Sequence, residues 1–479
     1  MLYERKKDMF IARENEINEL EAKYQTGNFE FVIIYGRRRI GKTRLIEEFT
    51  KDKECIFFSA MKDGSRNESL IQLSKCISGS EGDDFPIFPS FQSAFHKIAG
   101  MALDRRIVFV IDEFPYLEDN DGYFSSILQN TIDREFKKTK LFLIISGSAV
   151  SFMEDSVLGY NNPLYGRCTL IQRLQNFDYY DTARWFPNYS SYEKAILYGV
   201  TGGVPYYLEQ FSPELSLKDN LKLNFFNGNS VLFNEAENLL KEELREPGTY
   251  KEIISAIANG KTKYTEIADA CKIKSGALNK YLKTLIELKI ISRKMPMGGD
   301  EKKAIYHVSD LYFRFWFFFV PRNYSAILSR RIQNAFDVAV WRLINDYMGK
   351  VFEMISMEFL VYRDKDLPIL PADVGSWWGG NPKTKKECEI DVVMKSATDN
   401  SVVLGSCKFT NSPIGIAELK LMEEYADAMG TKGKRYYYFF SLSGFSENLV
   451  ASSSDTIRLI DIDTLYDIID QDPRGHEQN

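Results

Sequence analysis

A glycine-rich loop between an apolar strand and an amphipathic helix constrains this chain more than any other feature. Residues 31–35 read FVIIY, a short β-branched run that predicts a buried central strand. Residues 36–43 then read GRRRIGKT, which is the G-x-x-x-x-G-K-T pattern of a phosphate-binding loop. The residues after it continue with helical spacing and place Leu45, Ile46 and Phe49 on one side. Strand, loop and helix in this order predict an α/β domain that binds a nucleotide.

The chemistry of phosphate binding explains the residue types in this loop. Gly36 and Gly41 permit backbone conformations in which successive N–H groups curl around a phosphate, and the following helix directs its positive N-terminal end at the anion. We expect Lys42 to reach the β- and γ-phosphates and the Thr43 hydroxyl to bind Mg²⁺. The predicted nucleotide contacts are Gly36, Arg37, Arg38, Arg39, Ile40, Gly41, Lys42, Thr43 and Arg44. The alternative is a glycine-containing turn that binds nothing.

Length and composition limit the remaining possibilities. With 479 residues the chain is expected to form two to four domains, and its net charge of −6 means that any nucleic-acid contact must come from a local patch. Six scattered cysteines without a C-x-x-C pair argue against structural zinc and against a disulfide framework. The N-terminus lacks the apolar core of a signal peptide, and the longest apolar run, residues 313–320, is too short to span a bilayer. We therefore expect a cytoplasmic protein with no membrane partner.

A second apolar run, residues 107–113 (IVFVIDE), ends in two acids. In an open α/β sheet, a buried strand presents its C-terminal end to the ligand. Asp112 is therefore predicted to hold the Mg²⁺ shell, and Glu113 to orient and deprotonate an attacking water. The alternative is a strand that merely ends in solvated acids, and the preceding phosphate-binding loop favours the catalytic interpretation.

Two later segments carry further candidate residues. Residues 141–148 (LFLIISGS) predict another buried strand that ends in small hydroxyl side chains. Residues 163–167 (PLYGR) precede a predicted strand at 168–171. Arg167 is predicted to compensate charge in the transition state, either at the nucleotide of its own chain or at that of a neighbouring subunit. A structural ion pair is the alternative for this arginine.

Two helical segments flank these motifs. Residues 10–20 (FIARENEINEL) predict an amphipathic helix that begins near Arg13 and packs beside the loop, or else a charged surface helix. Residues 198–208 (YGVTGGVPYYL) contain a G-G-x-P sequence that must break or cap helices. This second segment is expected to form either a helical lid on the nucleotide or a tight turn between helices.

Together, FIARE, GRRRIGKT, VIDEF, IISGS, PLYGR and TGGVPYYL resemble the archaeal-type ATPase family of the STAND group, a branch of P-loop NTPases related to AAA+. The resemblance covers the first half of the chain and implies ATP and Mg²⁺ as cofactors. It also implies that strand 141–148 lies between the loop strand and the acid-ending strand, with Ser146 or Ser148 sensing the γ-phosphate. The segment around Arg13 would lie near the adenine, and Ala12 stands where the family pattern has glycine.

Residues 248–310 predict a winged helix-turn-helix. Three helical segments are followed by a hairpin around Gly298-Gly299. The segment contains 12 Lys and Arg against 7 Asp and Glu, a local basic excess in an acidic chain. Its third helix would expose Lys274, Lys280 and Lys283, where DNA-reading proteins place their contact residues. The resemblance supplies the alternative, a module that packs on the ATPase domain and binds no nucleic acid.

The C-terminal part resembles a PD-(D/E)XK nuclease fold and the DUF234 region that accompanies this ATPase family. The resemblance rests on a helix, a strand hairpin, a strand, a helix and a further strand, with the sequences KVFE, SWW, EIDVV and CKF.

In active nucleases of this fold, an Asp and the acid of (D/E)-X-K hold Mg²⁺ while the Lys orients the attacking water. Asp391 and Lys408 match that pattern, and Glu353 matches the helix acid. Ser406 stands where the second acid belongs, and a hydroxyl cannot replace the charge of a carboxylate on a hard cation. Glu389 is the candidate substitute. The resemblance leaves open a metal-dependent nuclease with Asp391 as a metal ligand, and a degenerate nuclease fold used for binding or oligomer contacts.

We therefore expect an α/β protein with a P-loop parallel sheet and a helical lid, a winged helix-turn-helix and an α/β nuclease-like domain. The expected boundaries are 1–185 for the ATPase domain, 186–247 for the lid, 248–310 for the winged helix, 311–345 for an aromatic helical linker and 346–479 for the nuclease-like domain. The expected function is an ATP-binding switch with slow Mg²⁺-dependent ATPase activity. The alternatives are an ATP-regulated DNA nuclease and a non-catalytic DNA-binding regulator, and homo-oligomer formation stays open.

Overall fold

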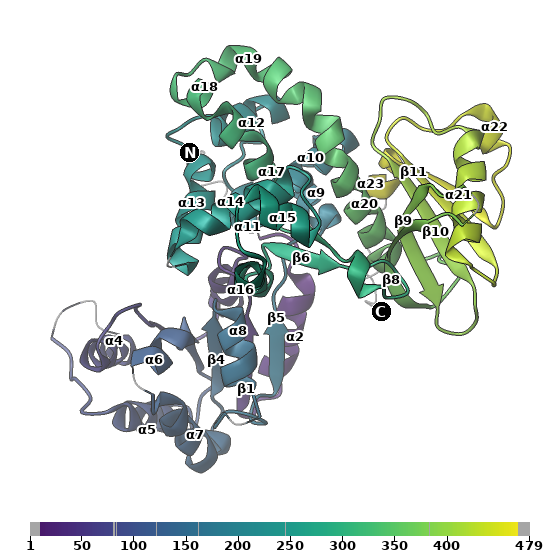
Figure 1. Cartoon of the computed structure of the whole chain (residues 1–479). Coiled ribbons are helices and arrows are strands. Elements are labelled where there is room, and N and C mark those ends of the chain that lie inside the picture. Colours follow the sequence, from purple (N-terminus) through teal and green to yellow (C-terminus); the bar gives the residue numbers. More distant parts are fainter. Residues whose placement is uncertain are drawn as a thin grey trace. The chain divides into compact units, whose positions relative to one another are not determined.

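The computed structural model describes residues 10–79, 82, 84–120, 122–160, 162–244, 246–382 and 384–467 (Figure 1). The chain divides into two compact units. The first consists of Met1–Asn176 with Val204–Tyr206, and the second of Phe177–Gly203 with Tyr207–Asn479. The finer five-part division stays a prediction. In the part of the chain that the structure describes, none of the helices combines the length and the apolar character that crossing a membrane requires.

The first unit is built on a five-stranded parallel sheet with the order β2-β3-β4-β1-β5. The strands are β1 (Glu30–Tyr35), β2 (Cys55–Ser59), β3 (Val108–Asp112), β4 (Phe142–Gly147) and β5 (Leu170–Arg173). Every residue of β1, β3 and β4 is buried, as expected for central strands whose two faces are covered by helices. Because β4 lies between β1 and β3, the expected order of these three strands is confirmed.

Alternate residues of β1 face two different cores. Val32 and Ile34 pack with α2 (Glu14–Tyr24) and α3 (Lys42–Thr50). Phe31 and Ile33 face the opposite core, because successive side chains of a strand point to opposite faces. The helices that contribute to this opposite core are α4 (Arg66–Ser78), α5 (Phe91–Met101), α6 (Phe114–Asn120) and α7 (Phe124–Arg134).

The second unit begins with helices and includes the 248–310 segment. Its first helices are α9 (Tyr179–Arg184), α10 (Ser191–Thr201), α12 (Leu217–Phe225) and α13 (Val231–Glu243), and α11 (Pro205–Leu208) follows α10 in the chain. The 248–310 segment contains α14 (Pro247–Ala258), α15 (Tyr264–Ala270), α16 (Ser275–Glu287) and the antiparallel hairpin of β6 (Ile291–Lys294) and β7 (Ile305–Val308). The next helices are the aromatic α17 (Leu311–Phe319), α18 (Tyr324–Leu328), α19 (Ile332–Ala339) and α20 (Ile344–Tyr362).

A mixed five-stranded sheet with the order β12-β11-β10-β9-β8 forms the C-terminal part of the second unit. Its strands are β8 (Pro371–Gly380), β9 (Glu387–Ser396), β10 (Val402–Lys408), β11 (Arg435–Ser441) and β12 (Ile457–Asp461). β8, β9 and β10 are antiparallel neighbours, whereas β10, β11 and β12 are parallel. α21 (Ile416–Met429) connects β10 to β11, and α22 (Glu447–Val450) and α23 (Ile462–Tyr466) complete the fold. The predicted order of helix, hairpin, strand, helix and strand is thus present.

The loop between β6 and β7 lies against the edge strand β8. The backbone N–H of Met297 donates to the carbonyl of Ser376 at 2.9 Å, and the indole N–H of Trp378 donates to the carbonyl of Lys303 at 3.2 Å. Met297 is also buried in the core of the C-terminal sheet. The loop therefore covers part of the β8 edge of the sheet, through the backbone groups of Met297 and Lys303.

α10 and α20 pack closely through a glycine. A Cβ on Gly199 would lie 2.7 Å from the sulfur of Met348, so a larger residue would force the helices apart. The hydroxyl of Tyr347 donates to the carbonyl of Gly199 at 2.6 Å. One turn of α10 therefore contacts the N-terminal half of α20 directly.

A buried polar cluster joins the same two helices further along. Glu358 of α20 accepts hydrogen bonds from the hydroxyl of Tyr198 at 2.6 Å and from the backbone N–H of Tyr179 at 3.2 Å. Beside it, Arg363 donates to Asp178 at 2.5 Å. Burial raises the pKa of Glu358 to about 7, because little water is left to solvate the carboxylate.

Candidate nucleotide-binding site

The loop between β1 and α3 closes back on its own lysine. Lys42 is the first residue of α3 and is buried. Its Nζ donates to the carbonyl of Gly36 at 3.0 Å and to that of Arg37 at 3.1 Å. Burial lowers the pKa of Lys42, and the nearby carboxylates of Glu113 and Asp112 oppose that shift. The ammonium group is thus held within the loop, beside the acids at the end of β3.

Neither glycine of the loop can be replaced without cost: at Gly36 a side chain would clash, and Gly41 has a backbone conformation that other residues rarely adopt. A Cβ on Gly36 would lie 2.6 Å from the carbonyl oxygen of Leu174 and would also meet the side chain of Ile40. Gly41 precedes α3 in a left-handed conformation with a φ of 87°. A bare backbone loop at the N-terminal end of a helix, with a lysine inside it, fits a phosphate chain.

The acids at the end of β3 are tied to the loop and to β4. The hydroxyl of Thr43 donates to Asp112 Oδ2 at 3.1 Å, and the hydroxyl of Ser146 donates to Asp112 Oδ1. Ser148 donates to Glu113 Oε2 at 2.8 Å. The two serines therefore have different partners. The oxygens of Thr43 and Asp112 are a donor set that fits the hard cation Mg²⁺.

Glu113 itself has a left-handed backbone with a φ of 54°. Non-glycine residues in this region are uncommon, and such strain concentrates at functional sites. The strand ends at Asp112, and the backbone N–H of Glu113 donates to Asp112 Oδ1 at 3.1 Å. The Glu113 carboxylate is held by Ser148 at the edge where the phosphate-binding loop begins.

The predicted helix near Arg13 packs against the loop. Arg13 is buried and donates to the carbonyl of Ile40 at 3.3 Å and to that of Gln175 at 2.5 Å. Ala12 has a φ of 63°, a left-handed conformation that glycine adopts without strain. This conformation explains why the family pattern has glycine at that position.

The remaining loop arginines differ in their surroundings. Arg38 donates to the hydroxyl of Tyr116 at 2.7 Å. The guanidinium of Arg39 lies 4.9 Å from the ring centroid of Tyr206, and the carbonyl of Arg39 accepts from the Tyr206 backbone N–H at 3.4 Å. Arg44 lies in the first turn of α3 and is half-buried.

The contact made by Tyr206 comes from the G-G-x-P segment and was missed by sequence reasoning. Gly202 caps the C-terminal end of α10, and Pro205 begins α11. A Cβ on Gly41 would lie 3.9 Å from Pro205, so the proline borders the phosphate-binding loop. The segment is a helix–helix turn that also reaches the loop. The G-G-x-P pattern signalled the turn, but nothing local indicated which surface it would meet.

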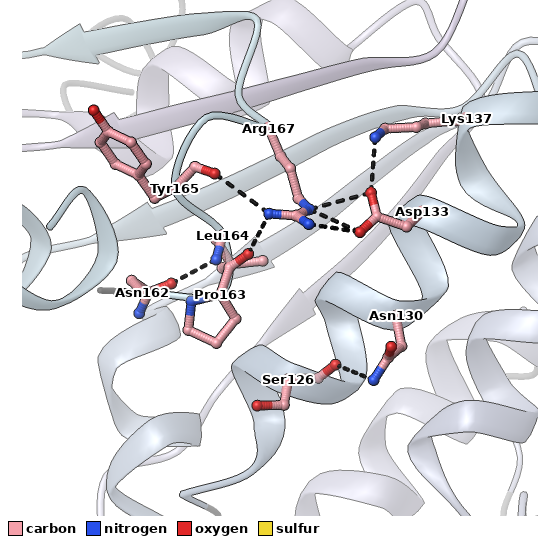
Figure 2. A network of polar contacts seen from close by, with 9 residues as sticks. All are labelled: Ser126, Asn130, Asp133, Lys137, Asn162, Pro163, Leu164, Tyr165 and Arg167. Carbon is pink, nitrogen blue, oxygen red and sulfur yellow. Dashed lines mark hydrogen bonds and ion pairs between the residues drawn. The ribbon is translucent and has the colours of Figure 1, made fainter. Parts of the chain in front are cut away.

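Arg167 belongs to a separate network of polar contacts around Asp133 (Figure 2). Its guanidinium donates to Asp133 at 2.6 Å and to the carbonyl of Pro163 at 2.7 Å, and Lys137 also pairs with Asp133 at 2.7 Å. The bonds from Arg167 and Lys137 hold the pKa of Asp133 at about 2. A structural ion pair, which was the alternative for Arg167, is therefore present.

The strand register explains this location. The N–H of Thr169 donates to the carbonyl of Phe31, so Arg167 lies level with the start of β1. The phosphate-binding loop follows the other end of that strand, five residues further at about 3.3 Å each, or roughly 17 Å away. A role for Arg167 at the nucleotide of its own chain does not agree with this geometry. A role at a neighbouring copy stays a prediction.

The predicted nuclease-like residues meet around β10. Asp391 Oδ2 accepts from the backbone N–H of Cys407 at 2.8 Å. Glu418 of α21 accepts from Ser406 at 2.6 Å and pairs with Lys408 at 3.1 Å. A carboxylate that sequence reasoning overlooked therefore lies beside the serine that replaces the second acid. Its only sequence signal is an acid in the first turn of the helix after β10.

The other acids of this region are also paired. Lys350 lies 3.0 Å from Glu353 and 2.8 Å from Glu389. Burial and the neighbouring carboxylate of Asp391 raise the pKa of Glu353 to about 7. Among the residues that the structure describes, no three His, Cys, Asp or Glu side chains are arranged to hold a metal ion. Asp391 as a metal ligand stays a prediction.

The predicted DNA-facing lysines are exposed on α16 or directly before it. Lys274, Lys280 and Lys283 all lie at the surface, and Lys283 is 3.7 Å from Glu287. The loop between β6 and β7 contacts β8 through Met297 and Lys303, so a DNA partner of this segment would be expected at the helix face instead.

The parallel sheet, the loop that encloses Lys42 and the acids at the end of β3 define a P-loop ATPase domain. Residues 10–211 match a family described as an ATPase domain predominantly from Archaea, and residues 316–423 match DUF234, archaeal and bacterial proteins of unknown function. An uncharacterized protein of Methanocaldococcus jannaschii is 33% identical over 408 residues, which are 82% of this chain and 89% of the relative. The chain therefore belongs to the archaeal-type ATPase family that carries a C-terminal DUF234 domain.

Other similarities are shorter or weaker. An uncharacterized ATP-binding protein of the same organism is 44% identical over 46 residues, 10% of this chain and 78% of that protein. A Walker-type ATPase of Pyrococcus abyssi aligns with a TM-score of 0.49 at 20% identity and covers 64% of this chain and 96% of its own. The ORC2 protein of Aeropyrum pernix, in ADPNP–ADP complexes, aligns with a TM-score of 0.46 at 13% identity, over 68% of this chain and 96% of its own. Both scores are below 0.5, so neither structure bears on the function of this chain.

Proposed function

We propose that the protein is an ATP-controlled switch that binds Mg·ATP in the first unit and hydrolyses it slowly. The observation that carries this proposal is the connected set of contacts at the end of the sheet. Lys42 is held by the loop carbonyls, Thr43 and Ser146 bond to Asp112, and Ser148 bonds to Glu113.

Each of these side chains has a distinct task. Lys42 binds the β- and γ-phosphate oxygens, for which its partners in the structure, the carbonyls of Gly36 and Arg37, are neutral substitutes. Thr43 and Asp112 would hold the Mg²⁺ shell, and the ion, when bound, would neutralise phosphate charge. Glu113 orients and deprotonates the attacking water, and Ser148 fixes its carboxylate.

The switch would act through the G-G-x-P segment. Tyr206 stacks on Arg39 of the loop, and α10 ends four residues before Pro205. α10 in turn contacts α20 at Gly199 and at Tyr198. A conformational change in the loop on nucleotide binding would therefore be transmitted to α10. This helix packs against α20, the first element of the nuclease-like part.

The second unit would act as a binding module. Exposed Lys274, Lys280 and Lys283 favour duplex DNA as its partner. A degenerate nuclease fold is favoured over an active one, because Ser406 replaces the second acid and Glu418 neutralises Lys408. Plasmid nicking with Mg²⁺ or Mn²⁺ that is lost in Asp391→Ala would support the active alternative instead.

Calorimetry of the full chain with Mg·ATP tests the nucleotide site. We expect the wild type to bind, Lys42→Ala to give no binding heat, and Glu113→Gln to bind but turn over about 10²-fold to 10⁴-fold more slowly. Lys51→Ala is the matched control, because this lysine is exposed just past the far end of α3. A flat trace for the wild type, or tight binding by Lys42→Ala, would contradict the proposal.

A further inference from the structure

β5 carries a second arginine, Arg173, at the opposite end of the strand from Arg167. In the parallel pairing of β1 and β5, Arg173 lies opposite Tyr35, the last residue of β1. The N–H of Leu174 donates to the carbonyl of Tyr35 at 2.8 Å. Since the phosphate-binding loop begins at the next residue, Arg173 lies at the loop end of the sheet, where Arg167 does not.

Arg173 is held there by an exposed ion pair. Its guanidinium lies 2.8 Å from Glu154 Oε1, and the two side chains are 38% and 36% exposed. The hydroxyl of Tyr35 donates to the same carboxylate oxygen at 3.3 Å. An ion pair between exposed side chains contributes little to stability, so the guanidinium can exchange this carboxylate for another anion at low cost.

Glu154 belongs to a segment that is tied to the nucleotide site. It lies in the π-helical turn Met153–Val157, which follows β4, and π turns are rare structures that often occur at functional sites. A Cβ on Gly147 would lie 2.7 Å from the sulfur of Met153, so the turn packs directly on the end of β4. That end of β4 carries Ser146 and Ser148, which bond to the acids of β3.

We propose that Arg173 contacts the terminal phosphate of ATP bound to its own chain, and that Glu154 holds this arginine when no triphosphate is bound. The inference rests on the proposed ATP binding. Phosphate oxygens would replace the Glu154 carboxylate as acceptors of hydrogen bonds from the guanidinium, whose paired N–H donors match the geometry of a phosphate. ADP lacks the γ-phosphate and would leave the Arg173–Glu154 pair in place. The arginine would therefore distinguish ATP from ADP.

Binding measurements on the full chain test this without relying on turnover. We expect Arg173→Ala to bind a non-hydrolysable Mg·ATP analogue at least about tenfold more weakly while its ADP affinity changes less than about twofold. Arg173→Lys keeps the positive charge but loses the paired guanidinium donors, so its affinity for the analogue should lie between those of the wild type and Arg173→Ala. Glu154→Gln removes the competing carboxylate and should tighten analogue binding about twofold to fivefold.

Arg167→Ala is the matched control. This arginine also flanks β5 and pairs with a carboxylate, but at the other end of the strand. At concentrations where the protein is a single chain, Arg167→Ala should bind both nucleotides as the wild type does. Equal losses of analogue and ADP affinity in Arg173→Ala, or no loss of either, would overturn the inference. A wild type that binds neither nucleotide would instead refute the proposed function on which it rests.

Discussion

The buried carboxylate of Glu358 allows a test of how burial raises a pKa and thereby changes the stability of the second unit with pH. This carboxylate of α20 accepts hydrogen bonds from the hydroxyl of Tyr198 and from the backbone N–H of Tyr179. The titratable groups that act on it from the packed elements are Asp178 and Arg363, with Tyr179, Tyr198 and Tyr466 as buried phenols. Substitution by glutamine keeps the shape and the acceptor oxygen but removes the charge.

The sign and size of the effect follow from the pKa. Burial raises the pKa of Glu358 from 4.5 to about 7. As pH rises between these values, the unfolded chain loses this proton while the folded protein keeps it, so the free energy of unfolding falls. The total fall is roughly 3 kcal/mol, reached near pH 7 and constant above it. Glu358→Gln cannot ionise, so this contribution to the pH dependence should disappear.

Thermal unfolding between pH 5 and pH 8.5 measures the difference. At about 1.6 °C per kcal/mol for a unit of about 300 residues, we expect Glu358→Gln to gain roughly 5 °C over the wild type at pH 8, with little difference at pH 5. Glu423→Gln, an exposed carboxylate of α21, is the control and should follow the wild type. Parallel curves for the wild type and Glu358→Gln across this range would refute the reasoning.

Two further predictions concern single elements. Ala12→Gly should raise the stability of the first unit by about 1 kcal/mol, because the φ of 63° strains alanine but not glycine, and an unchanged or lower unfolding temperature would contradict this. Replacing Lys274, Lys280 and Lys283 together with glutamate should abolish salt-dependent binding of duplex DNA and leave the fold intact, since all three are exposed. Unchanged DNA affinity in a filter-binding or anisotropy titration would remove this helix as the contact.

Sequence reasoning predicted the P-loop ATPase domain from residues that are neighbours in the chain, and the residue roles within its nucleotide site stay predictions. The glycines of the loop, Lys42 and the acids at the end of β3 are specified by short patterns, because a backbone cradle and the end of a buried strand are local structures. The strand order followed from a family resemblance and agrees with the sheet, with β4 between β1 and β3.

What the sequence by itself determined is therefore the glycine-containing loop between a buried strand and a helix, since its conformation depends on glycine and on the helix that follows. Only the tertiary structure decided which distant side chains join them. The register of β5 against β1 puts Arg173 at the loop end of the sheet, level with Tyr35, and Arg167 at the other end. Packing likewise brings Tyr206 to the loop and Glu418 beside Ser406. Such pairings depend on strand register and on contacts between segments far apart in the chain, and no local pattern encodes them.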